Sequence, residues 1–270
     1  MNNRPIGIFD SGLGGLTAMR ELRRILPNEN IIYFGDTGRM PYGGRPAAEI
    51  RRIAVQNIDF VEKHGVKAIL AACGTISSNA QDILSACGTK TVGVLMPGVR
   101  ELAMTGKNKL AVIATGTSIK SGAFTREIHK LVPDAAVTAV ACPDFVPMIE
   151  AGHTDKSDPV VRDTVARTLE PVKAAGSEAL LLGCTHYGII AEAIAEYLPG
   201  VLLIGAADAA ARELAAYLRS ADALCSEHTY DSFYTSGSIE DFVSLAPLML
   251  GSALDSEVSY VPPMPTEEDV

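Results

Sequence analysis

The sequence predicts an α/β protein with parallel sheets, and two observations support this fold class. Short apolar runs alternate with amphipathic stretches along most of the 270 residues. These runs span four to six residues and do not alternate with polar residues, which is typical of strands buried on both faces. Strands of that kind that alternate with helices form parallel sheets covered by helices. A chain of this length can bury roughly 75% of its unfolded surface, enough for a full core.

Seven apolar runs mark the expected strands, at residues 6–9, 31–34, 68–72, 92–95, 110–114, 179–182 and 201–204. Five amphipathic segments predict helices, at residues 16–26, 45–64, 160–175, 189–198 and 207–219. The last ten residues, 261–270, contain three prolines and three acidic side chains, so a frayed tail is expected there. In a parallel sheet, ligands bind in the loops beyond the carboxyl ends of the strands.

Charge and cysteine content exclude several classes of partner. The chain carries 23 basic and 32 acidic residues, a net charge of −9, and no run of Lys or Arg. Nucleic acids and anionic membranes are therefore not expected partners. Five scattered cysteines without zinc-site spacing predict no bound metal and reduced thiols. The chain shows no signal peptide and no apolar run of the ~20 residues that a membrane helix needs, so a cytoplasmic protein is expected.

A weak internal repeat suggests two similar halves. Residues 65–75 can be aligned with residues 176–186, and this places Cys73 on Cys184 at the end of an apolar run. Two such units packed face to face about a pseudo-two-fold axis would direct both sulfur atoms into one cleft from opposite sides. A chance likeness between two buried strands is the alternative explanation.

Two opposed thiols suit the inversion of a stereocentre, because one removes a proton and the other delivers one, with no cofactor. A free thiol has a pKa of about 8.5, so each needs a partner to act near neutral pH. Asp10 and Asp36 end the first two strands and are expected to reach the same cleft. His186 lies two residues after Cys184, and Glu150 is a further candidate on that side. All of these residues also have a structural interpretation, as core thiols or as caps of turns.

Two glycine-rich stretches follow the first two strands. Residues 10–17 open a helix, where backbone N–H groups can hold an anion. The stretch is neither a dinucleotide-binding GxGxxG motif nor a Walker A loop, so a carboxylate is as reasonable a ligand as a nucleotide. Residues 35–44 offer backbone donors and the hydroxyl of Tyr42, or form a purely structural loop. The other cysteines, Cys87, Cys142 and Cys225, are expected to be small core residues.

Four segments together resemble the glutamate racemase family: residues 6–17, 33–43, 181–187 and 234–237, in order along essentially the whole chain. The resemblance implies a cofactor-independent racemase that interconverts L- and D-glutamate for peptidoglycan synthesis. It implies two pseudo-symmetric α/β domains with the active site between them. The first would comprise residues 1–97 and 208–260, and the second residues 98–207. Family members are often dimers, so a homodimer is one assembly open to this chain.

The resemblance also implies residue roles. Cys184 would take the proton from L-glutamate, and Cys73 would take it from D-glutamate. Asp10 would assist Cys73, whereas His186, together with Glu150, would assist Cys184. The implied substrate-binding set is Asp10, Ser11, Asp36, Tyr42, Gly43, Gly74, Thr75, Thr117, Thr185 and His186.

The sequence departs from the family pattern beside the first thiol. Gly74 stands where the family has Asn, and a lost hydrogen bond to a charged group costs about 1.5–3 kcal/mol, roughly 10- to 150-fold in binding or rate. Ile76 replaces a small Ala, and Gly205-Ala206 stands where Asp-Ser is frequent. A racemase for another acid such as aspartate, a weakly active paralogue and a non-catalytic protein that binds an acidic metabolite therefore remain alternatives.

Overall fold

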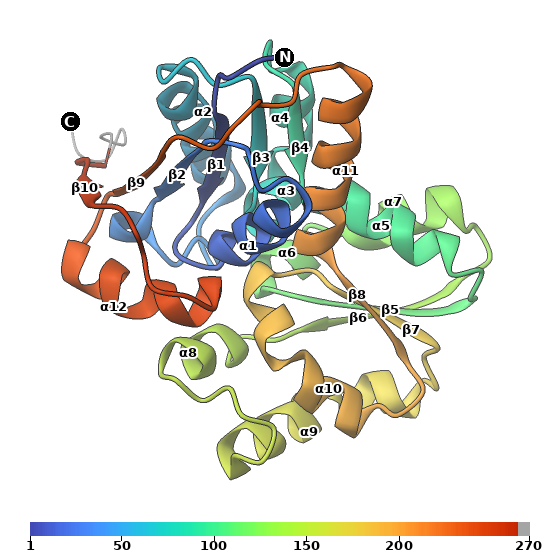
Figure 1. The fold of residues 1–270 in the computed structure, drawn as a ribbon. Helices are drawn as coiled ribbons and strands as arrows, with labels where there is room; N and C mark the ends of the chain where they lie inside the picture. Colours follow the sequence, from blue (N-terminus) through green and yellow to red (C-terminus); the bar gives the residue numbers. More distant parts are fainter. Residues whose placement is uncertain (264–270) are drawn as a thin grey trace.

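Two parallel sheets form two lobes of the molecule (Figure 1). The computed structural model describes residues 1–263, so most of the predicted tail lies outside the described residues. The six-stranded sheet contains, in spatial order, β10 (Val258–Tyr260), β9 (Asp231–Thr235), β2 (Ile31–Gly35), β1 (Ile6–Asp10), β3 (Ala68–Ala71) and β4 (Thr91–Gly93). The four-stranded sheet contains β6 (Ala136–Ala141), β5 (Lys109–Ala114), β7 (Ala179–Leu182) and β8 (Leu202–Gly205).

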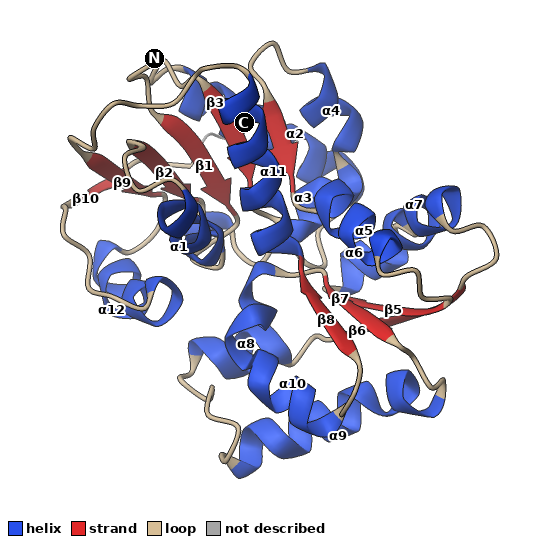
Figure 2. Ribbon diagram, turned by 45° about the vertical axis from the view of Figure 1, so that its right-hand side comes forward, coloured by secondary structure: helices blue, strands red, loops and turns tan. Residues whose placement is uncertain are grey.

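Helices cover both sheets, as the alternating pattern predicted (Figure 2). Those of the first half are α1 (Gly15–Ile25), α2 (Ala47–Glu62), α3 (Gly74–Asn79), α4 (Gln81–Ala86) and α5 (Leu95–Met104). The middle of the chain adds α6 (Gly116–Lys120), α7 (Ala123–Leu131), α8 (Phe145–Glu150), α9 (Pro159–Ala174) and α10 (Ala191–Tyr197). The last helices are α11 (Ala206–Ser220) and α12 (Ile239–Leu250), and the short 3₁₀ turns are η1 (Thr37–Arg39) and η2 (Thr185–Ile190).

The predicted fold class is confirmed. All seven predicted strands and all five predicted helices are present, with ends within two residues of the predicted ones. Every residue of β1, β2, β3 and β7 is buried, which is why these strands appear as continuous apolar runs. Three strands were missed: β6, β9 and β10. β6 is a partly exposed edge strand of small residues, and β9 and β10 contain polar side chains.

The two sheets share one strand order, which accounts for the internal repeat. Strands β2-β1-β3-β4 match strands β6-β5-β7-β8, and all recorded pairings are parallel. Each matched third strand, β3 or β7, leads directly to Cys73 or Cys184. Gly65 and Gly176, which precede these strands, have φ values of 66° and 61°, a conformation that favours glycine. Both α/β units therefore present a thiol at the same topological position.

The two ends of the chain build the larger sheet, and the middle builds the smaller one. The chain leaves the first sheet through α5 and returns through α11, and these two helices pack against each other between the lobes (Figure 2). Domain boundaries near residues 97 and 207 stay a prediction. None of the helices within residues 1–263 combines the length and the apolar composition of a membrane-spanning segment.

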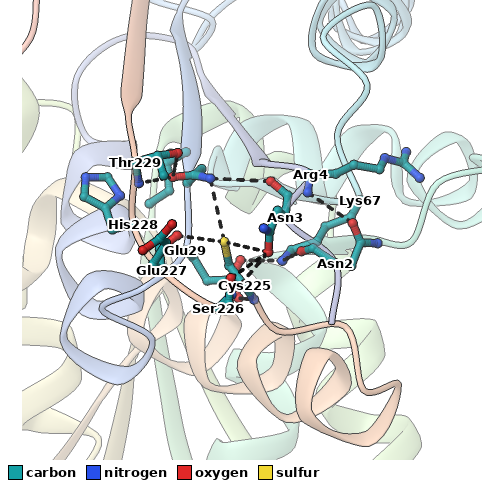
Figure 3. Close-up of polar contacts among 12 residues, drawn as sticks. Asn2, Asn3, Arg4, Glu29, Lys67, Cys225, Ser226, Glu227, His228 and Thr229 are labelled. Carbon is teal, nitrogen blue, oxygen red and sulfur yellow. Dashed lines mark hydrogen bonds and ion pairs between the residues drawn. The ribbon is translucent and has the colours of Figure 1, made fainter.

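A polar cluster closes the end of the larger sheet where β2 and β3 begin (Figure 3). Its centre is a buried ion pair between Lys67 Nζ and Glu29 Oε2, 2.5 Å apart. Lys67 also donates to the backbone oxygen of Asn2, and Glu29 accepts from the backbone N–H of Cys225. The cluster therefore joins the start of the chain to the segment that leads into β9.

Candidate active site

A cleft of about 1020 Å³ lies between the lobes, and its walls are the loops that follow the strands. Most of the residues that were predicted for the site line it: Asp10, Ser11, Tyr42, Gly43, Cys73, Gly74, Thr75, Thr117, Glu150, Cys184, Thr185 and His186. The two thiols approach from different lobes, because β3 belongs to the larger sheet and β7 to the smaller one. Ile76 does not line the cleft and is fully buried.

Cys73 is buried beside a carboxyl group. It follows β3, and the neighbouring strand β1 ends at Asp10, whose carboxylate accepts a hydrogen bond from the backbone N–H of Gly15 at 2.7 Å. Burial raises the pKa of Cys73 to about 12, with a further contribution from the charge of Asp10. Burial also raises the pKa of Asp10, although His186 partly offsets this effect. Cys73 therefore holds its proton at neutral pH.

Cys184 lies beside a histidine that is itself held by a carboxylate. Its Sγ atom is 3.8 Å from His186 Nδ1, and His186 Nε2 is 3.0 Å from Glu150 Oε1 at the end of α8. Burial alone lowers the pKa of His186, but hydrogen bonds to Cys184 and Glu150, with the charge of Asp10, outweigh it and raise this pKa to about 10. A cationic imidazole therefore stands next to Cys184 at neutral pH.

Asp36 does not reach the cleft, and the expectation that it would is wrong. Its side chain is fully buried and accepts hydrogen bonds from Arg39 Nε at 2.7 Å, from Ser236 Oγ at 2.6 Å and from the Tyr42 hydroxyl. The Tyr42 hydroxyl also accepts from Asn57 at 3.1 Å, so it is committed behind the cleft wall. The network holds the loop of residues 36–44 instead of offering an oxygen to a ligand.

Hydroxyl groups join the lobes along the cleft. Thr117, on α6, accepts a hydrogen bond at 2.6 Å from the backbone N–H of Gly44. Thr75 Oγ1 and Thr115 Oγ1 are 3.0 Å apart. Thr117 therefore connects the loop of residues 36–44 to the smaller lobe, in addition to lining the cleft.

Sequence reasoning missed several lining residues, of which Cys142 is the most informative. It was expected to be only a core thiol; it is 1% exposed, but it also lines the cleft at the end of β6. Cys73 and Cys184 were identified because each follows the end of a predicted strand. The same criterion would have identified Cys142 if β6 had been predicted. The other missed lining residues include Met40, Arg45, Asn79, Thr115, Lys120 and Val146.

Known proteins of similar sequence and structure show the family of this chain. The Asp/Glu/hydantoin racemase family matches residues 7–214. A glutamate racemase of Neisseria meningitidis is 39% identical over 257 residues, covering 93% of this chain and 94% of that protein. A glutamate racemase of Thermus thermophilus is 44% identical over 217 residues, covering 80% of each chain. The crystal structure of the Francisella tularensis glutamate racemase in complex with D-glutamate has a TM-score of 0.89 at 37% identity, covering 97% of this chain and 98% of that one. The chain therefore belongs to the Asp/Glu/hydantoin racemase family, among the glutamate racemases that its motifs resemble.

Proposed function

We propose that the chain interconverts L- and D-glutamate by proton transfer at Cα between Cys73 and Cys184. One observation carries the proposal: thiols from equivalent strand ends of the two lobes line one cleft, and each has its own acid–base partner. The Francisella relative, whose structure contains D-glutamate, supports glutamate as the substrate.

In the L-to-D direction, the thiolate of Cys184 takes the Cα proton, and an S–H bond replaces the C–H bond. The electron pair left on Cα delocalises into the substrate carboxylate. Cys73 then gives its proton to the opposite face, which forms the new C–H bond and leaves a thiolate. These protonation states match the form of the site that receives L-glutamate, because Cys73 holds its proton and the His186 cation lies beside Cys184. In the reverse direction the two thiols exchange roles, with Asp10 accepting from Cys73.

The residues next to the thiols hold the substrate in this proposal. Ser11 and Thr185 adjoin acid–base residues, Thr75 lies two residues after Cys73, and all three line the cleft. Their hydroxyl and backbone groups would bind the amino and carboxylate groups of glutamate. The reaction would supply D-glutamate for peptidoglycan in the cytoplasm. The homodimer implied by the resemblance can be checked by sedimentation.

Proton NMR of L-glutamate with the purified protein in D₂O tests the proposal when optical rotation is followed on the same sample. We expect the Cα proton signal and the optical rotation to decay together. Cys73→Ser and Cys184→Ser should each abolish racemisation, and full activity in either variant would refute the two-thiol scheme. Exchange without loss of rotation would mean that only one thiol works. If glutamate does not exchange but aspartate does, the substrate assignment is wrong.

A further inference from the structure

We infer that Gly74 sets the separation of the two thiols, because it lets the two cysteine loops touch backbone to backbone. This inference rests on the proposed function. Gly74 directly follows Cys73, and Gly183 directly precedes Cys184. A Cβ atom at residue 74 would overlap the carbonyl oxygen of Gly183, well inside the 3.0 Å limit for such contacts. It would also lie 3.4 Å from the carbonyl carbon of Gly183 and 3.8 Å from Cys184 Cα.

Both loops are held within their own lobes. The backbone N–H of Gly183 donates to the oxygen of Ile113 at 2.7 Å, and a Cβ at Gly183 would lie 3.0 Å from the Phe124 ring. On the other side, Gly74 is the first residue of α3, and the oxygen of Cys73 accepts from the N–H of Ser77 at 2.9 Å. A side chain at residue 74 must therefore push the lobes apart.

Hydrogen bonds hold the lobes together on either side of this contact. Ser78 Oγ donates to Ser118 Oγ at 3.1 Å, which joins α3 to α6, next to the bond between Thr75 and Thr115. Thr17 Oγ1, on α1, donates to the backbone oxygen of Thr185 at 3.0 Å. Because these bonds hold the lobes against each other, the backbone contact at Gly74 limits how closely they approach.

The spacing matters because both sulfur atoms must reach the same carbon atom from opposite faces. Proton transfer requires heavy atoms within about 3–3.5 Å, and a displacement of about 1 Å can reduce the rate by roughly 100-fold. The Asn expected at residue 74 would not fit between the loops. The two loops can come this close only when residue 74 has no side chain. We therefore assign Gly74 as a positioning residue for the pair of thiols.

Gly74→Ala and Gly74→Asn test the inference, with Gly88→Ala as the matched control. Gly88 is exposed, and a Cβ there would have no atom within 4 Å. We expect kcat to fall by about 10- to 100-fold in Gly74→Ala and further in Gly74→Asn, with smaller changes in KM. The ratio of Cα deuterium exchange to racemisation in D₂O should rise, because one thiol can still abstract a proton when the opposite one is too far away.

Alkylation gives a readout that does not depend on turnover. Cys73 is 3% exposed in the closed cleft, so its modification by iodoacetamide, followed by peptide mass spectrometry, should be faster in both Gly74 variants and unchanged in Gly88→Ala. Wild-type kcat in either Gly74 variant would overturn the inference. The inference would also be overturned if kcat fell only in parallel with a lower Tm, while the ratio of exchange to racemisation and the alkylation rate of Cys73 stayed unchanged. A wild-type protein without racemase activity would refute the proposed function, whereas the alkylation rates would still decide the spacing.

Discussion

The substitution Glu150→Gln tests whether the carboxylate of Glu150 keeps His186 protonated. Glu150 Oε1 is 3.0 Å from His186 Nε2, and both side chains are largely buried, with 16% and 6% of their surfaces exposed. Burial opposes the imidazolium, so the pKa of about 10 depends on its partners. A hydrogen bond to a charged group contributes about 1.5–3 kcal/mol, which corresponds to roughly 1–2 pKa units. In the variant, the pKa of His186 should therefore fall to about 8–9.

The rate of L-glutamate racemisation should follow that titration. In the wild-type protein, the alkaline fall of kcat in the L-to-D direction should be centred near pH 10, where His186 loses its proton. In Glu150→Gln the same fall should begin 1–2 pH units lower, so that the two enzymes differ little at pH 7 and by roughly tenfold at pH 9.5. Circular dichroism of glutamate across the pH range measures both profiles.

The control is Glu240→Gln, an exposed substitution on α12 that should leave the profile unchanged. An alkaline limb at the same pH in Glu150→Gln and wild type would refute the argument that Glu150 holds the proton on His186. A uniform decrease at every pH would also contradict it, because that result would assign Glu150 a role in packing alone.

Three further outcomes are expected. Asp36→Asn should loosen the loop of residues 36–44 and raise KM for glutamate by about 10-fold or more, with a smaller effect on kcat; steady-state kinetics measure both, and an unchanged KM would count against it. Lys67→Met should leave Glu29 buried without its partner (Figure 3) and lower the free energy of unfolding in urea by about 3–5 kcal/mol without changing kcat; a loss below 1 kcal/mol would contradict this. Thermal stability should fall between about pH 6.5 and pH 10. His186 keeps its proton up to about pH 10 in the folded state but only to about 6.5 when unfolded, so its contribution is complete below pH 6.5 and is lost as pH rises. A Tm that His186→Gln leaves equally dependent on pH would refute that assignment.

The sequence predicted the fold class well because buried parallel strands leave a strong local pattern. The repeat around Cys73 and Cys184 also predicted a shared cleft, since matched strand ends must face it in a pseudo-symmetric pair. The missed strands show the limit of that pattern. β9 has polar residues because Asp231 binds Arg23 and the backbone N–H of Ile31, contacts that depend on residues about 200 positions away.

Asp36 and Gly74 show two further limits. Asp36 directly follows β2, much as Asp10 ends β1, but Arg39 and Ser236 bind its carboxylate behind the wall, and sequence position alone does not give that direction. The sequence alone led us to interpret Gly74, in place of Asn, as the loss of a hydrogen bond to a charged group. The structure instead shows a close approach of two backbones, which depends on how the lobes pack and leaves no local signal.

Because β9 lies late in the chain, the larger sheet can be completed only after the strands of the smaller sheet have been synthesised. β9 pairs with β2, and Thr235 and Ser236 bond to the loop that begins at Asp36. The four strands of the smaller sheet are continuous along the chain and leave the ribosome before β9 does. All strands of this unit have therefore been synthesised while the N-terminal part still lacks its neighbour strand. A nascent chain that stops before residue 231 would carry both thiols without the support that holds one wall of their cleft.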